Sequence, residues 1–448
     1  MTHLVGIGGI GMSAIARLLL ARGEKVTGSD VKITPLIQKL RSEGAFINIG
    51  HRAENVDGAT RVVVSSAIDK ANPEVARALE RNIPLTTRGR MLAELTAGKK
   101  TIAVAGTHGK TTTTAMIAKV LTGGGLDPTV AIGGEPIESG MNACLGKGEW
   151  FVTESDESDG SFLHLNPSIA VVTNIENDHV RSEDEWKAMM GTFDRFVAKI
   201  PSDGLLIAGV DNQYSAELVL RNKHVPQICY GINAWQADLH ASITDYEDYG
   251  TRATISSRGQ LLGTLRLRVP GEINVENALA AIAVGTHLGL GFETIADALD
   301  EFAGVRRRFE FLLREPNLSV VDDYAHHPTA VRATIATARR YHKGPLVVAF
   351  EPHRYTRTRY LARDFADALS GADHVVLAPI YAASEAPIAG VTSRSIGEPL
   401  AARGKAVTYV NDVKALPDTL KITAPSGSLV LMLGAGAITE SARKFAER

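Results

Sequence analysis

Cysteine is scarce in this sequence, and neither sign of charge is in excess. Only two of the 448 residues are cysteine, Cys144 and Cys229, which is too few for a disulfide framework, so a reducing cytoplasm is the expected compartment. The 48 basic and 50 acidic side chains leave a formal net charge of −2. There is therefore no basic excess to indicate binding to nucleic acid or to an anionic membrane.

Long apolar runs are also missing. No stretch approaches the roughly 20 apolar residues that a membrane-spanning helix needs. We expect no signal peptide, because Met1-Thr2-His3 leads directly into strand-like residues. The sequence shows no internal repeat and no Ser/His/Asp or Cys/His arrangement with a marked nucleophile. These absences leave a globular protein with no marked nucleophile.

The composition that is present is that of an ordinary globular protein, 44% hydrophobic and 22% charged. A chain of 448 residues predicts about three domains. Strand-like and helix-like runs alternate in residues 1–97 and again in residues 312–448. This alternation predicts an α/β fold built on parallel sheets.

One glycine-bearing segment has the form of a phosphate-binding loop. Gly106-Thr107-His108-Gly109-Lys110-Thr111-Thr112 lies between an apolar strand-like run, residues 101–105, and a helix-like run, residues 115–121. In such a loop the backbone N–H groups and the helix N-terminus point at anionic oxygens. Lys110 is then placed to reach the β- and γ-phosphates, and the Thr111 hydroxyl to ligate Mg²⁺. The alternative is a glycine-rich turn capped by threonine, since Val104 stands where a full P-loop has its first glycine.

A second glycine-rich turn lies near the N-terminus. Gly6-Ile7-Gly8-Gly9-Ile10-Gly11 matches G-x-G-x-x-G, and Asp30 follows 19 residues after Gly11, as a ribose-binding carboxylate would. The pattern predicts that a nucleotide diphosphate lies here, without specifying NAD. The alternative is a tight turn between a strand and a helix that binds nothing.

Acidic residues and a histidine follow two further strand-like runs. Residues 149–153 end in Glu154-Ser155-Asp156-Glu157-Ser158-Asp159-Gly160, and residues 169–174 lead to Asp178-His179. Ligands of open α/β sheets bind at the carboxyl ends of the strands, so these groups suit a two-metal phosphoryl site near Lys110. The alternatives are a solvated acidic turn and a structural histidine.

Two amides stand at the predicted start of a small-residue helix after Pro270. Asn274 and Asn277 are three residues apart, and they either hydrogen-bond an adenine edge or cap the helix. From the residues alone, capping is the favoured interpretation.

Polar clusters follow two strand-like runs in the last third of the chain. Residues 318–321 lead to Asp322-Asp323-Tyr324-Ala325-His326-His327-Pro328, and residues 346–350 lead to Glu351-Pro352-His353-Arg354-Tyr355-Thr356-Arg357-Thr358. Arg354 and Arg357 are suited to grip one carboxylate through their planar guanidinium groups. The alternative is two surface arginines paired with acids such as Asp364 and Asp367.

These segments, taken in order, resemble the Mur ligases over nearly the whole chain. The motifs that carry the resemblance are Gly6 to Ser13, Gly106 to Thr113, Glu154 to Phe162, Thr173-Asn174-Ile175 with Asp178-His179, Arg307 to Glu310, Asp322 to Pro328, and Pro352 to Thr358. Within the family, the acidic form of the third motif points to the member that adds alanine.

The resemblance implies three domains: a Rossmann-like UDP-sugar domain (1–97), a central P-loop-type ATPase domain (98–311) and a C-terminal Rossmann-like α/β amino-acid domain (312–448). It implies a cytoplasmic, ATP-dependent ligase, a monomer or homodimer, that joins L-alanine to the lactyl carboxylate of UDP-N-acetylmuramate in peptidoglycan precursor synthesis. The reaction passes through an acyl phosphate. ATP and two Mg²⁺ ions are expected, with Mn²⁺ as an alternative, and neither nucleic acid nor membrane is an expected partner.

The resemblance also implies roles for residues at matching positions. It places the UDP-sugar at Gly8, Gly11, Asp30 and Ser66. It places the nucleotide at Gly106, Thr107, His108, Gly109, Lys110, Thr111, Thr112, Asn274, Asn277, Arg308 and Asp323. It makes Thr111, Glu154 and His179 metal ligands, His326, Arg354 and Arg357 alanine contacts, and Lys110, His179 and His326 the catalytic groups.

Some positions depart from the family pattern. Ile273 replaces a usual histidine, Arg181 stands where an aspartate often follows His179, and no lysine matches the carbamylated lysine of some relatives. Two other classes compete with the ligase: an NAD(P)-binding oxidoreductase or sensor, from Gly6 to Asp30 alone, and a P-loop kinase or switch, from Lys110 and Thr111 alone. Neither explains both glycine-rich loops together with Arg354 and Arg357.

Overall fold

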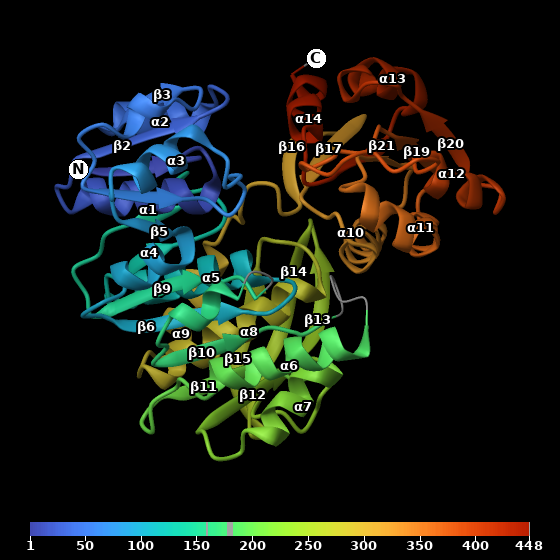
Figure 1. The fold of residues 1–448 in the computed structure, drawn as a ribbon. Helices are drawn as coiled ribbons and strands as arrows, with labels where there is room; N and C mark the ends of the chain where they lie inside the picture. The colour runs from blue at the N-terminus through green and yellow to red at the C-terminus, as the bar shows by residue number, and fades with distance from the viewer. Residues whose placement is uncertain (158–159, 177–181, 448) are drawn as a thin grey trace. The chain divides into compact units, whose positions relative to one another are not determined.

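The structure, a computed structural model, describes residues 1–157, 160–176 and 182–447 (Figure 1). The chain forms two compact units. Unit 1 comprises residues 1–242, 253–265 and 275–302, and unit 2 comprises residues 243–252, 266–274 and 303–448. Within the described residues, the strands form three β-sheets.

The first sheet has five parallel strands in the order β3-β2-β1-β4-β5. Strand order reverses beside β1, and the first glycine-rich turn follows β1 directly, at the place where open α/β sheets bind ligands. The elements are β1 (Thr2–Val5), α1 (Ile10–Ala21), β2 (Val26–Asp30), α2 (Pro35–Ser42), β3 (Phe46–Ile49), η1 (Ala53–Val56), β4 (Arg61–Val64), α3 (Pro73–Glu80), β5 (Leu85–Thr87) and α4 (Arg88–Leu95).

The second sheet has ten strands in the order β15-β14-β13-β12-β11-β10-β6-β9-β7-β8. Its elements are β6 (Lys100–Ala105), α5 (Lys110–Gly123), β7 (Thr129–Ala131), β8 (Ala143–Cys144), β9 (Trp150–Glu154), η2 (Ser161–His164), β10 (Ile169–Val172), α6 (Glu183–Val197), β11 (Leu205–Gly209), α7 (Gln213–Arg221), β12 (Gln227–Gly231), β13 (Leu239–Glu247), β14 (Gly250–Ser257), β15 (Gln260–Leu267), α8 (Glu272–His287) and α9 (Phe292–Asp300). Strand β6 lies between β10 and β9 and is parallel to both, so the loops after these three strands meet at one edge.

The third sheet lies in unit 2 and has the order β16-β17-β21-β18-β19-β20, with only β16 antiparallel to its neighbour. Its elements are β16 (Glu310–Glu315), β17 (Leu318–Asp323), α10 (Pro328–Tyr341), β18 (Leu346–Phe350), α11 (Tyr355–Leu369), β19 (His374–Leu377), α12 (Arg394–Ala401), β20 (Ala406–Tyr409), η3 (Val413–Ala415), α13 (Leu416–Thr423), β21 (Ser428–Leu433) and α14 (Ile438–Ala446).

The central strands are mostly apolar, as expected for a parallel sheet that is covered by helices on both faces. Every residue of β10, β11, β18 and β21 is buried. The core of the first sheet continues into Ala131, Ala143 and Phe151 of the second, which joins these two sheets in unit 1. The predicted α/β fold is confirmed, whereas the boundaries at 97/98 and 311/312 stay a prediction.

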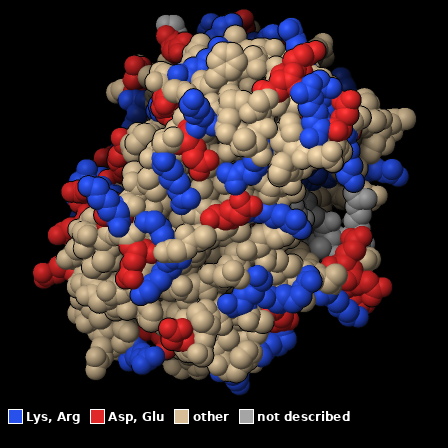
Figure 2. Space-filling view, turned by 60° about the vertical axis from the view of Figure 1, so that its left-hand side comes forward, with Lys and Arg blue, Asp and Glu red and all other residues tan. Residues whose placement is uncertain are grey.

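The surface agrees with the balanced charge of the sequence. On the face shown in Figure 2, lysine and arginine side chains are interspersed with aspartate and glutamate. Within the described residues, no helix is long and apolar enough to cross a membrane.

Candidate active site

The loop between β6 and α5 has the backbone of a phosphate-binding turn. Helix α5 begins at Lys110, directly after Gly109, which has φ +82°. Gly106 has φ +128°, and a Cβ there would collide with the Thr173 hydroxyl. A Cβ at Gly109 would lie 2.5 Å from Asn277 Oδ1. Both positions therefore require glycine, for conformation and for space.

The segment after β10 supports this loop through side-chain hydrogen bonds. The Thr173 hydroxyl donates to the His108 carbonyl oxygen at 2.6 Å, and Asn174 Oδ1 accepts from the His108 backbone N–H at 2.9 Å. The Thr107 N–H donates to the Asn174 carbonyl oxygen at 3.0 Å. Because β10 is hydrogen-bonded to β6, these contacts hold the loop against the end of the neighbouring strand.

Lys110 lies at the first position of α5 with its ammonium turned back over the loop. Its Nζ donates to the carbonyl oxygens of Gly106 at 2.5 Å and Thr107 at 3.5 Å, and it pairs with Glu157 Oε2 at 2.8 Å. Burial lowers the pKa of Lys110, but the charges of Glu157 and Asp156 outweigh burial and raise it above its usual value. The side chain is therefore a permanent cation in the cradle.

Oxygen-bearing side chains lie at the same sheet edge. Thr111 is 6% exposed in the first turn of α5, and Glu154 is the last residue of β9, opposite Val104 of β6. The carboxylate of Glu154 lies against the backbone of Gly133, where no side chain would fit. A hydroxyl and a carboxylate suit the hard-oxygen preference of Mg²⁺. The predicted ligand His179 lies outside the described residues.

The other loop residues that were predicted to bind the nucleotide make contacts within the protein. His108 Nε2 lies 3.2 Å from Glu176 Oε2. Thr107 accepts the Glu176 backbone N–H at its hydroxyl, 2.8 Å away, and Thr112 is buried in α5. The loop therefore presents its backbone and Lys110, while several of its side chains brace it.

The favoured interpretation of Asn274 and Asn277 as caps of helix α8 is wrong. The helix begins at Glu272, so both asparagines lie inside it. The Asn277 side chain accepts from the Thr113 hydroxyl at 2.9 Å and lies beside Gly109, whereas the Asn274 amide donates to the Pro270 carbonyl at 2.7 Å. Asn277 thus reaches the phosphate loop through the fold, which its helical position in the sequence did not indicate.

In the N-terminal glycine-rich turn, the backbone is hydrogen-bonded to Asp30, the carboxylate predicted to bind the ribose. The Gly8 N–H donates to Asp30 Oδ2 at 2.9 Å, and a Cβ at Gly8 would lie 2.8 Å from that oxygen. A Cβ at Gly11 would lie 3.1 Å from Cδ of Arg88. Ser66 is exposed in the turn after β4, at the same edge. All four predicted UDP-sugar residues therefore lie at or beside the carboxyl edge of the first sheet.

A hollow of about 190 Å³ adjoins this edge and was not indicated by the sequence. It is lined by Val64, Ile68, Asp69, Lys70, Val75, Leu85, Thr86, Thr87 and Arg90. Ile68 also lies beside Gly6 of the glycine-rich turn. The residues come from three segments, so no local pattern joins them.

In unit 2, aromatic and basic side chains gather at the ends of β17, β18 and β19. The rings of His326 and His353 lie 5.4 Å apart, and the ring of Tyr381 stacks on His353 at 5.7 Å. Arg357 is buried and donates to His353 Nδ1 at 3.1 Å. Arg354 precedes α11 with φ +70°, and its side chain is exposed. The sequence assigned roles to His326 and the two arginines, named His353 in a polar cluster without a role, and assigned no role to Tyr381.

Asp323 and Arg308 lie near this cluster. Asp323 accepts the backbone N–H groups of Phe309 at 2.7 Å and Ala325 at 2.8 Å. Burial raises its pKa, against the opposing charge of Arg308. Arg308 lies over the Tyr324 ring at 5.0 Å. Asp367, which the alternative interpretation paired with Arg354 or Arg357, forms an ion pair with Arg403 at 2.5 Å.

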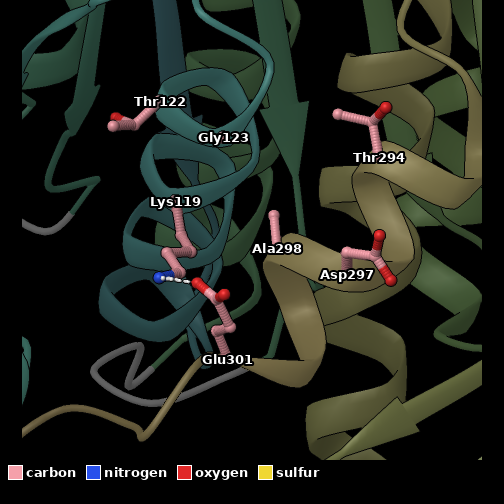
Figure 3. Close-up of a pocket in the computed structure, with 7 residues that line it drawn as sticks. All are labelled: Lys119, Thr122, Gly123, Thr294, Asp297, Ala298 and Glu301. Atoms are coloured by element: carbon pink, nitrogen blue, oxygen red, sulfur yellow. Dashed lines mark hydrogen bonds and ion pairs between the residues drawn. The ribbon is translucent and has the colours of Figure 1, made fainter.

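A larger hollow, of about 410 Å³, lies between α5 and α9 (Figure 3). Lys119 and Glu301 pair across it at 2.9 Å, and Gly123 and Ala298 allow the two helices to approach closely. It adjoins the C-terminal part of α5, a helix about 20 Å long from its start at Lys110. The hollow therefore lies away from the phosphate loop, and its lining is mostly polar and exposed.

Comparison with known proteins defines the class of the chain. Three family models match it in order: "Mur ligase family, catalytic domain" over residues 1–100, "Mur ligase middle domain" over 104–285, and "Mur ligase, glutamate ligase domain" over 307–436. The chain belongs to the Mur ligase family.

Full-length relatives within the family share one name. The UDP-N-acetylmuramate–L-alanine ligase of Geotalea daltonii is 45% identical over 448 residues, covering 100% of this chain and 97% of the relative. The protein of the same name from Desulfatibacillum aliphaticivorans is 46% identical, covering 99% and 97%.

Two solved structures are similar over their whole length. The crystal structure of the UDP-N-acetylmuramate-alanine ligase MurC from Thermotoga maritima has a TM-score of 0.86 at 32% identity, covering 100% of this chain and 98% of that one. A murein peptide ligase from Psychrobacter arcticus has a TM-score of 0.76 at 25% identity, with the same coverages. The predicted resemblance to the Mur ligases is confirmed.

Proposed function

We propose that this chain is an ATP-dependent ligase that joins L-alanine to the lactyl carboxylate of UDP-N-acetylmuramate, a step of peptidoglycan precursor synthesis. A carboxylate oxygen attacks the γ-phosphorus of ATP, and ADP leaves. The alanine amine then attacks the acyl carbon of the acyl phosphate, and inorganic phosphate leaves as the amide bond forms. The chain supplies position and charge in both steps and no covalent nucleophile.

The observation that carries this proposal is the phosphate loop after β6. Lys110 stands at the start of α5, on a turn whose two glycines have positive φ, at a sheet edge that also carries Glu154. Relatives named UDP-N-acetylmuramate–L-alanine ligase, aligned over 97–100% of this chain, support the identity of the two substrates.

Lys110 offsets the charge that develops on the transferred phosphoryl group. Thr111, Glu154 and His179 are the proposed ligands of two Mg²⁺ ions, with Mn²⁺ as an alternative. A divalent cation in such a site neutralises phosphate charge. Gly106, Thr107, His108, Gly109 and Thr112 surround the phosphates, and Asn274, Asn277, Arg308 and Asp323 are proposed for the rest of the nucleotide.

The two other substrates are assigned to the other two sheets. Gly8, Gly11, Asp30 and Ser66 are proposed for the UDP-sugar. His326, Arg354 and Arg357 are proposed for alanine, whose free carboxylate needs a cationic partner while its amine attacks. We place the reaction in the cytoplasm, in a monomer or homodimer, with neither nucleic acid nor membrane as a partner.

Product analysis tests the reaction. The protein is incubated with ATP, Mg²⁺, UDP-N-acetylmuramate and L-alanine. The mass of the nucleotide sugar is measured by mass spectrometry, and the inorganic phosphate released is quantified. We expect one phosphate per alanine joined and no product when any one substrate is omitted. A parallel arm replaces alanine with L-alanyl-γ-D-glutamyl-meso-diaminopimelate, a substrate in the name of a 28% identical relative from Neisseria meningitides. Product in that arm alone would overturn the choice of alanine.

A binding experiment separates the ligase from a nicotinamide-dependent protein. The melting temperature is followed while UDP-N-acetylmuramate, NAD⁺ or NADP⁺ is added, because a ligand stabilises the folded chain by RT ln(1 + [L]/Kd). We expect a shift with the UDP-sugar. A shift with a dinucleotide and none with the UDP-sugar would contradict the assignment of the first sheet.

A further inference from the structure

The ammonium group of Lys110 is held by oxygen atoms of the protein itself. A lysine ammonium has three N–H donors, and three oxygens surround it here: the Gly106 carbonyl, the Thr107 carbonyl and Glu157 Oε2. Two of these belong to the loop backbone and stay near the lysine. The Thr107 contact is long, so of the two short contacts the one with Glu157 is the one that a phosphate oxygen would replace.

The pair between Lys110 and Glu157 is shielded from water. The side chain of Lys110 is 18% exposed and that of Glu157 is 10% exposed. A carboxylate held 2.8 Å from this ammonium provides the negative charge that a nucleotide phosphate would otherwise provide. The pair keeps a buried cation neutralised, since a buried charge without a partner is costly.

We propose that Glu157 acts as a built-in substitute for the nucleotide phosphate: it neutralises Lys110 in the nucleotide-free chain and makes nucleotide binding depend on a divalent cation. The inference rests on the proposed function, because it takes the ligand of Lys110 to be a nucleotide triphosphate. Glu157 is thereby a positioning residue that acts on the substrate through Lys110.

The dependence on a cation follows from the charges around Glu157. Once a phosphate replaces Glu157 at Lys110, the Glu157 carboxylate remains beside the negative charge of Asp156, and it faces the added charge of the polyphosphate. Like charges close together in a shielded site repel strongly. A divalent cation brought with the nucleotide removes that repulsion, whereas free ATP does not.

A purely structural pair makes a different prediction. If Glu157 only stabilised the loop, its removal would loosen the cradle and weaken the binding of free ATP and of Mg·ATP alike. If the displaced Glu157 carboxylate repels a polyphosphate that has no cation, its removal strengthens the binding of free ATP more than that of Mg·ATP. The ratio of the two affinities therefore distinguishes the two roles, independently of any change in turnover.

The experiment measures nucleotide affinity by calorimetry in the full chain, with EDTA or with Mg²⁺, for wild type and Glu157→Gln. We expect the variant to bind free ATP about tenfold or more tightly than wild type, the effect of one charge-assisted hydrogen bond. We expect its Mg·ATP affinity to change by less than about threefold. Equal affinities of both proteins for free ATP, or a parallel loss for both forms of the nucleotide, would overturn the proposal.

Two further variants keep the test decisive. Glu149→Gln removes a glutamate that pairs with Lys100 at 3.0 Å just before β9, at an exposed site, and should leave both affinities unchanged. Glu157→Asp keeps the charge, so it should keep the wild-type dependence on Mg²⁺ even if Glu157→Gln does not fold. An Asp variant that binds free ATP tightly would contradict the role of charge. Because no sugar or amino acid is added, these results do not depend on which sugar and which amino acid the enzyme uses.

Discussion

Lys110 is the side chain on which the proposed chemistry depends most directly. It is a cation in a shielded loop at the N-terminus of α5. We expect Lys110→Ala to lower turnover by about 10²–10³, the typical effect of losing one electrostatic contact to a transition state. The measurement is kcat at saturating ATP, together with the melting temperature.

A lysine on the same helix provides the control for this substitution. Lys119 pairs with Glu301, as Figure 3 shows, and both side chains are partly exposed. Lys119→Ala should leave kcat near the wild-type value. Turnover close to wild type in Lys110→Ala would remove Lys110 from the mechanism.

The two candidate alanine-binding arginines differ in their surroundings. Arg357 is 8% exposed and bonded to His353, and Arg354 is exposed just before α11. Replacing either with lysine keeps the charge but removes the planar fork. We expect KM for L-alanine to rise about ten- to a hundredfold, the effect of a charge-assisted hydrogen bond, while KM for ATP changes little.

Arg359→Lys, at an exposed position on the same helix, is the matched control for these two variants. It should leave both KM values unchanged. If KM for alanine is also unchanged in Arg354→Lys and in Arg357→Lys, the carboxylate of the amino acid binds elsewhere in the molecule.

The start of α5 depends on a glycine that has no room for a side chain. Gly109 has φ +82°, and a Cβ there would lie 2.5 Å from Asn277 Oδ1. Gly109→Ala combines backbone strain of about 1–3 kcal/mol with displacement of Asn277 from the loop. We expect a raised KM for ATP as well as a lower melting temperature.

Gly125, just after the same helix, separates strain from displacement. It has φ +76° and no atom within 4 Å of its Cβ position. Gly125→Ala should therefore lower the melting temperature and leave KM for ATP as it is. Equal KM values for Gly109→Ala and wild type would show that Asn277 does not shape the phosphate loop.

The stability of unit 1 in acid is tied to one buried carboxylate. Glu74 of α3 has no exposed surface and accepts from the Ser29 hydroxyl at 2.5 Å, while His51 Nδ1 lies 3.3 Å away. Burial raises the pKa of Glu74, but the His3 ring 3.6 Å away and hydrogen bonds from Ser29 and Asn55 outweigh it and lower the pKa to about 2. The network joins α3 to the strands that carry the glycine-rich turn.

A lowered carboxylate pKa has a defined effect on stability. Its contribution is complete above the unfolded-state value near 4.5 and is lost as the pH falls toward 2. A shift of this size corresponds to about 3 kcal/mol. We expect Glu74→Gln to melt at a lower temperature than wild type at pH 7, with the difference shrinking as the pH falls from about 4.5 toward 2.

Glu80, exposed on the same helix and paired with Arg77, is the control for this prediction. Glu80→Gln should follow the wild-type melting curve at each pH. A gap between Glu74→Gln and wild type that stays constant across this pH range would mean that Glu74 contributes through packing and not through its charge.

Local patterns were enough to predict the α/β class, the two glycine-rich turns and the polar clusters that follow apolar strands. Each of these depends on neighbours within a few residues: Gly106 and Gly109 on the turn before α5, and Arg354 and Arg357 on the strand that precedes them. Strands β8 and β16 were not predicted: β8 has only two residues, too few for a periodic pattern, and β16 pairs antiparallel with β17, which follows it directly in the chain.

Contacts between distant segments arise only when the chain folds, because packing and not sequence separation determines which side chains meet. Glu157 reaches Lys110 across 47 residues, and Asn277 reaches Thr113 across 164. No periodicity relates such pairs, so the acidic turn had two interpretations of similar weight, and the residues alone favoured capping for the helix amides. Sequence alone therefore identified the candidate phosphate-binding loop, and the folded chain identified the carboxylate that pairs with its lysine.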